Sequence, residues 1–208
     1  MSLYLEAKCR LCRREGIKLY LKGQKCFSSK CPVDRRPKPP GQTARGYKRL
    51  SEYGIRLREK QKVKRTYGLR ERQFKKLFWD AKRIKGNTGS NLLIMLERRL
   101  DSILYRSGYA LSIPQARQLC SHGHVKVNGQ YVYSPSFLVS PGDEITFKEK
   151  SIETFKAIKE TTKDYISVPA YILILAEDKP RIKIMALPTA DDSRVKFNIQ
   201  YVVEYYTR

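Results

Sequence analysis

The sequence predicts an α+β fold, in which helices come first and a small antiparallel sheet follows. Apolar residues repeat at helical spacing between residues 47 and 107, and polar and apolar side chains alternate between turn signals over 124–147. Two close pairs of cysteines near the N-terminus add a third observation, because they indicate a metal-pinned segment. The 208 residues are enough for one medium domain or two small ones.

Positive charge is concentrated in the first half of the chain. Lysine and arginine total 43 against 20 acidic residues, which gives a formal net charge of +23. Residues 1–100 hold 29 of the basic residues and 8 of the acidic ones. Self-repulsion of this size is relieved when a polyanion exchanges its counterions for Lys and Arg contacts. The composition therefore favours a nucleic-acid partner over a surface that is basic and merely soluble.

The sequence shows no sign of a membrane partner. No run of about 18 apolar residues exists, and the start, MSLYLEAKCRLCRRE, lacks the apolar core of a signal peptide. We therefore expect a cytoplasmic location. In a reducing compartment, five cysteines favour a metal over disulfides.

Four of the cysteines have the spacing of a metal site. Cys9 and Cys12 form a C-x2-C pair, and Cys26 and Cys31 follow with four residues between them. Two such pairs suit a tetrahedral four-thiolate site that would give shape to a segment too short to bury a core. Zinc is the expected metal, an iron–sulfur cluster on the same cysteines is the alternative, and buried cysteines without a metal are the remaining explanation.

Basic residues surround the cysteines and continue through a linker at 32–46. Four prolines and two glycines there exclude a regular element, so we expect an extended path over a surface, with a solvated tail as the alternative. The candidate nucleic-acid contacts in this region are Arg10, Arg13, Arg14, Lys18, Lys22, Arg35, Arg36 and Arg45.

Two basic helices are predicted next. Residues 47–66 read as a helix capped by Ser51, with Tyr53, Leu57 and Val63 facing inward. A second helix at about 70–85 has Phe74, Leu77 and Phe78 inward, Trp79 partly buried, and Lys82 and Arg83 outside. The candidate contacts on these segments are Lys48, Arg49, Arg56, Arg58, Lys60, Lys62, Lys64, Arg65, Arg72, Lys75 and Lys76.

A third helix is predicted over residues 91–107, closed by Gly108, with Arg98 and Arg99 off its apolar stripe. The next segment reads as a short helix that begins after Ser112 and ends at Gly123, followed by a strand and the hairpin pair Asn128-Gly129. Ala116, Leu119 and Cys120 share its inner face. The polar candidates are Gln115, Arg117, Gln118, His122, His124, Lys126 and Asn128.

The rest of the chain adds strands and two helices. We expect strands to include residues 132–133, 137–139, 144–147, 171–175 and 181–185, and a short helix at 151–160. Residues 198–206 fit either a strand or a helix, and resemblance to the family described next favours a helix.

Residues 98–129, RRLDSILYRSGYALSIPQARQLCSHGHVKVNG, with PSFLVSPGDEI after them, closely resemble the RNA-binding module named after the fourth small-subunit ribosomal protein. The segments CRLCRREGIKLYLKG, RRPKPPGQ, LREKQKVKRTYGLRERQFKKLF and NIQYVVEYYTR resemble the whole bacterial-type family of that protein, in its four-cysteine form. The resemblance covers 1–150 and 195–208 and is poor over 160–195. Arg70 stands where the family usually has a Ser or Thr that caps the helix beginning at ERQF. We expect this to lower the stability of that helix start by about 1 kcal/mol.

The resemblance implies a structural ribosomal protein and not an enzyme. Such proteins bind small-subunit ribosomal RNA at a junction of several helices, nucleate assembly of the subunit body and influence decoding accuracy. They contact the fifth small-subunit protein, lie near the third and twelfth and beside the messenger entrance, and are not homo-oligomers. A pseudouridine synthase with the same module is the alternative, although too few residues remain for its catalytic domain. A heat-shock or stalled-ribosome factor would lack the four cysteines.

Three parts are expected along the chain. Residues 1–46 form the cysteine knuckle and basic linker, residues 47–89 form a helical domain completed by about 187–208, and residues 90–186 form an α/β domain containing the module at about 97–150. We expect residues 1–66 to supply salt-sensitive affinity and residues 90–150 to supply selectivity for RNA shape.

Overall fold

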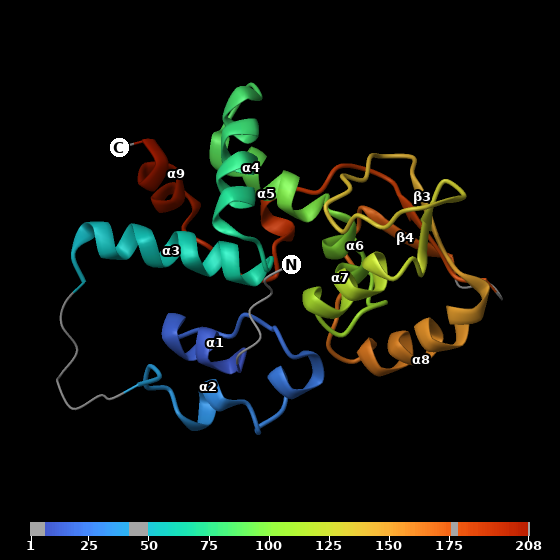
Figure 1. Cartoon of the computed structure of the whole chain (residues 1–208), viewed down its shortest axis with the longest axis horizontal. Helices are drawn as coiled ribbons and strands as arrows, with labels where there is room; N and C mark the ends of the chain where they lie inside the picture. The colour runs from blue at the N-terminus through green and yellow to red at the C-terminus, as the bar shows by residue number, and fades with distance from the viewer. Residues whose placement is uncertain (1–6, 42–49, 176–178, 208) are drawn as a thin grey trace. The chain divides into compact units, whose positions relative to one another are not determined.

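The computed structural model describes residues 7–41, 50–175 and 179–207 and divides the chain into two units (Figure 1). Unit 1 comprises Met1–Gly89 and Arg194–Arg208, and unit 2 comprises Ser90–Ser193. Residues 1–46, expected as a part of their own, cluster with the helical residues of unit 1. The candidate contacts Arg45, Lys48 and Arg49 lie outside the described residues.

The cysteine segment of unit 1 contains α1 (Cys9–Glu15), the 3-10 turn η1 (Gly23–Cys26) and α2 (Pro32–Arg35). Gly16 ends α1 in the left-handed region, with a φ of 72°. The helical turn α2 lies in the linker that was expected to be irregular. Pro32 starts it, because the first position of a helix needs no N–H donor. Cys12, Leu19 and Leu21 form a small buried cluster here.

The helical part of unit 1 consists of α3 (Glu52–Thr66), α4 (Glu71–Arg83) and the C-terminal α9 (Ile199–Thr207). The predicted cap is confirmed, since the Ser51 hydroxyl accepts a hydrogen bond from the Gly54 N–H at 3.2 Å. Val63, Phe74 and Phe78 are fully buried, as expected. Tyr53 was expected to face inward but is 62% exposed. The helical alternative for the last element is confirmed.

The boundary of unit 2 at Ser90 lies in the first turn of α5 (Thr88–Glu97), and α6 (Leu100–Arg106) follows. The continuous helix predicted over 91–107 is therefore wrong. Arg99 is extended, with φ −64° and ψ 140°, and forms a β-bridge with Leu138. The backbone N–H of Leu100 donates to the Phe137 carbonyl at 2.9 Å. The helix breaks because a distant segment takes over the hydrogen bonds of its backbone.

A five-stranded antiparallel sheet forms the centre of unit 2, in the order β2-β1-β3-β5-β4. Its strands are β1 (Val125–Val127), β2 (Gln130–Tyr131), β3 (Glu144–Phe147), β4 (Ile172–Leu175) and β5 (Arg181–Ile184). The predicted hairpin is confirmed: Asn128 and Gly129 have φ values of 48° and 81°. The extension through 132–133 and the strand at 137–139 are wrong, apart from the bridge at Leu138.

Helices cover one face of this sheet. The buried core joins Leu104 of α6, Cys120 of α7 (Ile113–Ser121) and Phe155 of α8 (Ile152–Thr162) to alternate strand residues such as Val125 and Ile182. Short 3-10 turns η2 (Glu149–Ser151) and η3 (Ala190–Asp192) complete the unit. The predicted mixture of helices and a small antiparallel sheet is confirmed. None of the described helices combines the length and apolar character that a membrane span requires.

Candidate nucleic-acid interface

The cations predicted to form an outward face on α3 are paired with carboxylates of unit 1. The Glu15 side chain is fully buried and accepts hydrogen bonds from Arg58, at 3.3 Å, and from Arg65. Burial raises the pKa of Glu15, while Arg58 and Arg65 oppose the rise. The other pairs are Arg56 with Glu204 and Glu52, Lys62 with Glu59, and Lys60 and Lys64 with Glu71.

Lys60 was predicted to lie on the outer side of α3, and this placement is wrong. Its side chain is 4% exposed, with the ammonium 2.7 Å from Glu71 and 4.3 Å from the ring centroid of Tyr205. Burial alone would raise the pKa of Glu71, but hydrogen bonds from Lys60, Lys64 and Tyr206 lower it to about 2. Lys60 is buried because α9 covers this side of α3.

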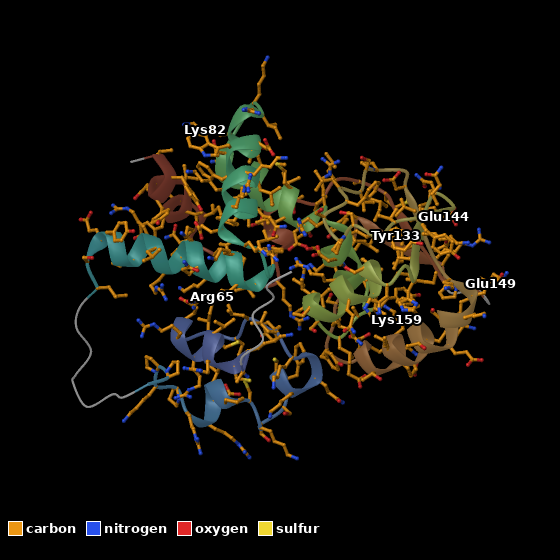
Figure 2. The ribbon with its side chains drawn as sticks, viewed as in Figure 1. Arg65, Lys82, Tyr133, Glu144, Glu149 and Lys159 are labelled. Carbon is orange, nitrogen blue, oxygen red and sulfur yellow. The ribbon has the colours of Figure 1, made fainter. Side chains whose placement is uncertain are left out.

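The exposed side of α4 carries positive charge that is not neutralised. We call it the α4 basic face, and it consists of Arg72, Lys75, Lys76, Trp79, Lys82 and Arg83, all exposed. Within residues 7–41, 50–175 and 179–207, no carboxylate pairs with Lys75, Lys76 or Lys82, and Arg83 reaches Asp80 only at 3.8 Å. Lys82 stands near the end of α4 that lies away from α3 (Figure 2). This face is therefore the better candidate for phosphate contacts.

The cysteine segment also exposes basic side chains. Two of its predicted contacts have structural partners: Arg13 donates from Nε to the carbonyl oxygens of Arg36 and Lys38, each at 3.0 Å, and Lys18 pairs with Asp34 at 2.7 Å. The predicted contacts that lie exposed here are Arg10, Arg14, Lys22, Arg35 and Arg36.

The four candidate metal ligands are free thiols from α1, η1 and the residue before α2. Cys12, Cys26 and Cys31 are buried. Burial raises the pKa of Cys12 to about 11, a backbone hydrogen bond at Leu19 opposes this, and the other three cysteines add to it. No three Cys, His, Asp or Glu side chains among the described residues are grouped so that they could hold a metal ion. The donor chemistry fits zinc, but the ligand group is not assembled in this structure.

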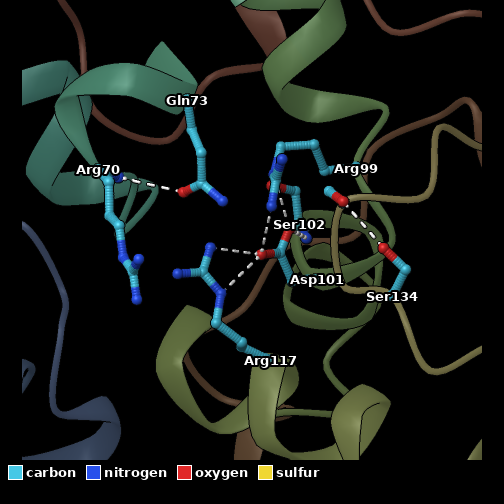
Figure 3. Close-up of polar contacts among 8 residues, drawn as sticks. Arg70, Gln73, Arg99, Asp101, Ser102, Arg117 and Ser134 are labelled. Carbon is cyan, nitrogen blue, oxygen red and sulfur yellow. Dashed lines mark hydrogen bonds and ion pairs between the residues drawn. The ribbon is translucent and has the colours of Figure 1, made fainter. Parts of the chain in front are cut away.

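A buried ion cluster organises the start of the hairpin module (Figure 3). Asp101 is fully buried and accepts two hydrogen bonds from Arg99, both at 3.1 Å, and two from Arg117, from Nη2 at 2.8 Å and from Nε at 3.2 Å. The Ser102 N–H donates to the same carboxylate at 3.0 Å. Arg99 and Arg117 were predicted to face outward, but they fix the junction of α6 and α7 instead.

Other predicted contacts of the module also have partners within unit 2. The Gln115 amide oxygen accepts from the Leu111 N–H at 2.6 Å, and His124 Nδ1 lies 2.8 Å from the Ser151 hydroxyl. Arg98 donates from Nε to the Val139 carbonyl at 2.9 Å, and the Asn128 side chain bonds Asp143 and the Glu144 N–H. Gln118 and His122 are exposed, and Lys126 is half-buried.

Sequence reasoning missed two aromatic side chains beside these groups. Tyr131 and Tyr133 are 45% and 62% exposed, and their rings stack with centroids 6.4 Å apart. Lys126 Nζ lies 4.6 Å from the centroid of Tyr131. Gly123 has a φ of 69°, and a Cβ there would lie 2.5 Å from the Tyr133 ring. The available signal was the alternation in the sequence of Tyr131, at the end of β2, and Tyr133, two residues later.

Exposed cations on α4, with aromatic and polar groups on the hairpin module, define the class as a nucleic-acid-binding protein. Comparison with known proteins is consistent with this class. Residues 4–97 match the model of the Ribosomal protein S4/S9 N-terminal domain, and residues 98–145 match the S4 domain. The second match covers the hairpin module from Arg98 to the second residue of β3, Ile145.

Relatives match over their whole length. Small ribosomal subunit protein uS4 of Thermoanaerobacter sp. (strain X514) is 49% identical over 208 residues, covering 100% of both chains. The uS4 proteins of Dictyoglomus turgidum and of Thermus thermophilus are each 48% identical, also with 100% coverage of both chains. The chain therefore belongs to the uS4 family of small ribosomal subunit proteins.

This result confirms the family that the sequence motifs indicated. The relatives are named small ribosomal subunit proteins, so the family is one of ribosomal proteins and not of enzymes. The alternative of a pseudouridine synthase carrying the same module is wrong.

Proposed function

We propose that the protein is a structural constituent of the small ribosomal subunit in the cytoplasm and binds its ribosomal RNA directly. Similarity to uS4 proteins along the whole chain is the observation that carries the proposal. The α4 basic face supplies exposed cations without internal carboxylate partners at Lys75, Lys76 and Lys82, as far as the chain is described. Release of counterions from the RNA backbone would favour binding at such a face.

The hairpin module would contribute selectivity by a different chemistry. Gln118 and His122 are exposed side chains that can hydrogen-bond sugar hydroxyls or the edges of exposed bases. Tyr131 and Tyr133 add exposed rings close to Lys126. RNA is read mainly by shape and at irregular places, so a rigid module that the Asp101 cluster holds together suits this role.

Family membership supports more specific proposals. The RNA site is a junction of several helices in the body of the subunit, and binding there nucleates assembly and influences decoding accuracy. The fifth small-subunit protein is a direct neighbour, the third and twelfth lie nearby, and messenger RNA passes close to the chain.

Binding to the small subunit is tested by sedimentation. We expect the tagged intact protein, expressed in bacteria, to sediment with small ribosomal subunits and to bind a transcript of small-subunit ribosomal RNA in a salt-dependent manner. A transcript of large-subunit RNA at the same concentration is the control. Equal binding to both transcripts and absence from small subunits would contradict the proposal.

We also propose that Cys9, Cys12, Cys26 and Cys31 bind one metal ion, with zinc as the expected metal and an iron–sulfur cluster as the alternative. The C-x2-C spacing of Cys9 and Cys12, the second close pair Cys26 and Cys31, and the burial of three of these four thiols support this. Zinc thiolate bonds would add stability to a segment whose buried cluster is small.

Elemental analysis of the intact protein tests the metal site. We expect about one zinc per chain, which is lost when Cys12 and Cys26 are replaced by serine. Cys120→Ser is the matched control, because Cys120 is equally free and buried but lies in α7. Iron with visible absorption would identify the cluster instead, and a protein without zinc or iron would refute metal binding.

A further inference from the structure

Trp79 is an exposed aromatic side chain in the middle of the α4 basic face. It is the one tryptophan of the sequence and is 40% exposed. Its ring meets the buried Phe78 edge to face, with centroids 5.7 Å apart and planes at 78°. A single apolar residue on a surface needs no explanation by itself, so the surroundings of Trp79 decide whether it has a role.

Every neighbour of Trp79 at helical contact spacing is basic. Residues three and four positions away on a helix lie beside one another on its surface. At these positions stand Lys75, Lys76, Lys82 and Arg83, all of them exposed. Lys82 Nζ lies 5.0 Å from the indole centroid, and Figure 2 shows Lys82 near the end of α4 that lies away from α3. The face therefore combines one flat aromatic ring with four cations around it.

We propose that Trp79 stacks on an unpaired base of the small-subunit ribosomal RNA, while the surrounding cations contact the phosphates on either side. This inference rests on the proposed function and adds that α4 recognises an unstacked nucleotide. A regular RNA helix offers α4 only phosphates and sugar, whereas an aromatic ring contacts a base that has left its stack. Lys82, on a flexible stem, moves from the indole to a phosphate.

The charges on this face favour RNA over the other possible occupants. A protein partner would have to supply several carboxylates to Lys75, Lys76 and Lys82, around a single ring. An anionic membrane offers the charge, but Trp79 is the one large apolar side chain exposed within Glu71–Arg83. One indole is too little apolar area for a helix to lie in a bilayer surface.

Indole fluorescence of the intact protein tests the proposal. Because the sequence has one tryptophan, its emission reports Trp79 alone. We expect small-subunit ribosomal RNA to quench this emission, and Trp79→Leu to lower the affinity about fivefold or more. The dependence of affinity on salt stays unchanged in this variant, because no cation is removed. Trp79→Phe keeps most of the affinity, since an aromatic ring remains.

Tyr53→Leu is the matched control, because Tyr53 is an exposed aromatic residue on α3, where the nearby cation Arg56 is paired. We expect the RNA affinity of the Tyr53→Leu variant to equal that of the unaltered protein. An equal loss of affinity in Trp79→Leu and Tyr53→Leu would overturn the inference. So would RNA binding without any change in indole emission, or quenching by anionic vesicles and not by RNA. Failure of the unaltered protein to bind RNA would instead refute the proposed function.

Discussion

Replacing Asp101 by alanine is expected to destabilise unit 2 by about 3–5 kcal/mol, because it leaves buried arginine side chains without their carboxylate. Asp101 is fully buried, and the Arg99 side chain is 6% exposed. Arg117 loses the same partner. Urea unfolding of the intact protein, followed by circular dichroism, measures the loss. Trp79 lies in unit 1, so its fluorescence separates unfolding of that unit from unfolding of unit 2.

Two further variants make this prediction specific. Glu149→Ala removes an ion pair with Lys179 in the same unit, but both side chains are exposed, so we expect stability close to that of the unaltered protein. Replacing Arg99, Asp101 and Arg117 together by Met, Leu and Met removes the charges with their partners, and we expect it to restore much of the stability. A much smaller loss of unfolding free energy in Asp101→Ala would contradict this prediction and would show that water reaches the two arginines.

Removing free cations is expected to change RNA binding much more than removing paired ones. We expect Lys75→Gln, Lys76→Gln and Lys82→Gln together to reduce the slope of log affinity against log salt by about two to three units. Each of these lysines is exposed and, over the described residues, has no carboxylate partner. Filter binding to small-subunit ribosomal RNA over a series of salt concentrations measures the slope.

A variant of α3 with the same change in net charge is the control. Arg56→Gln, Lys62→Gln and Lys64→Gln remove three cations that carboxylates already neutralise. We expect the slope of log affinity against log salt to change by less than about one unit in this triple variant. Equal changes in the two triple variants would mean that the ion pairs of α3 open on the RNA and that the original expectation for this helix holds.

Local signals in the sequence predicted much of the fold. Ser51 begins α3 through its own hydroxyl, and Asn128-Gly129 makes the hairpin because both residues adopt positive φ. The apolar run at 171–175 and the alternating residues at 181–185 predicted a strand pair, and β4 and β5 pair there. In each case the residues that specify the element lie inside it or next to it, so a reading along the chain can detect them.

Long-range contacts account for the errors. Nothing near Lys60 indicates that α9 places Tyr205 over its ammonium. The sequence over 91–107 has unbroken apolar periodicity, which predicts one helix. Leu138 forms a β-bridge with Arg99, and this contact divides the segment into α5 and α6. An arginine beside an apolar stripe reads as solvated unless the sequence reveals a buried carboxylate such as Asp101. The predicted outward placement is therefore wrong for several individual cations, among them Lys60, Arg99 and Arg117.

The division of the chain affects how the protein is made. Residues 90–193 form one continuous stretch, so unit 2 can fold as soon as that stretch has left the translating ribosome. Unit 1 starts earlier in the chain but waits for α9, which supplies Tyr206 against Phe78 at a ring distance of 4.6 Å. The first half of the protein is therefore the last to be finished, and a product that stops before the final helix leaves Phe78 uncovered to chaperones and proteases.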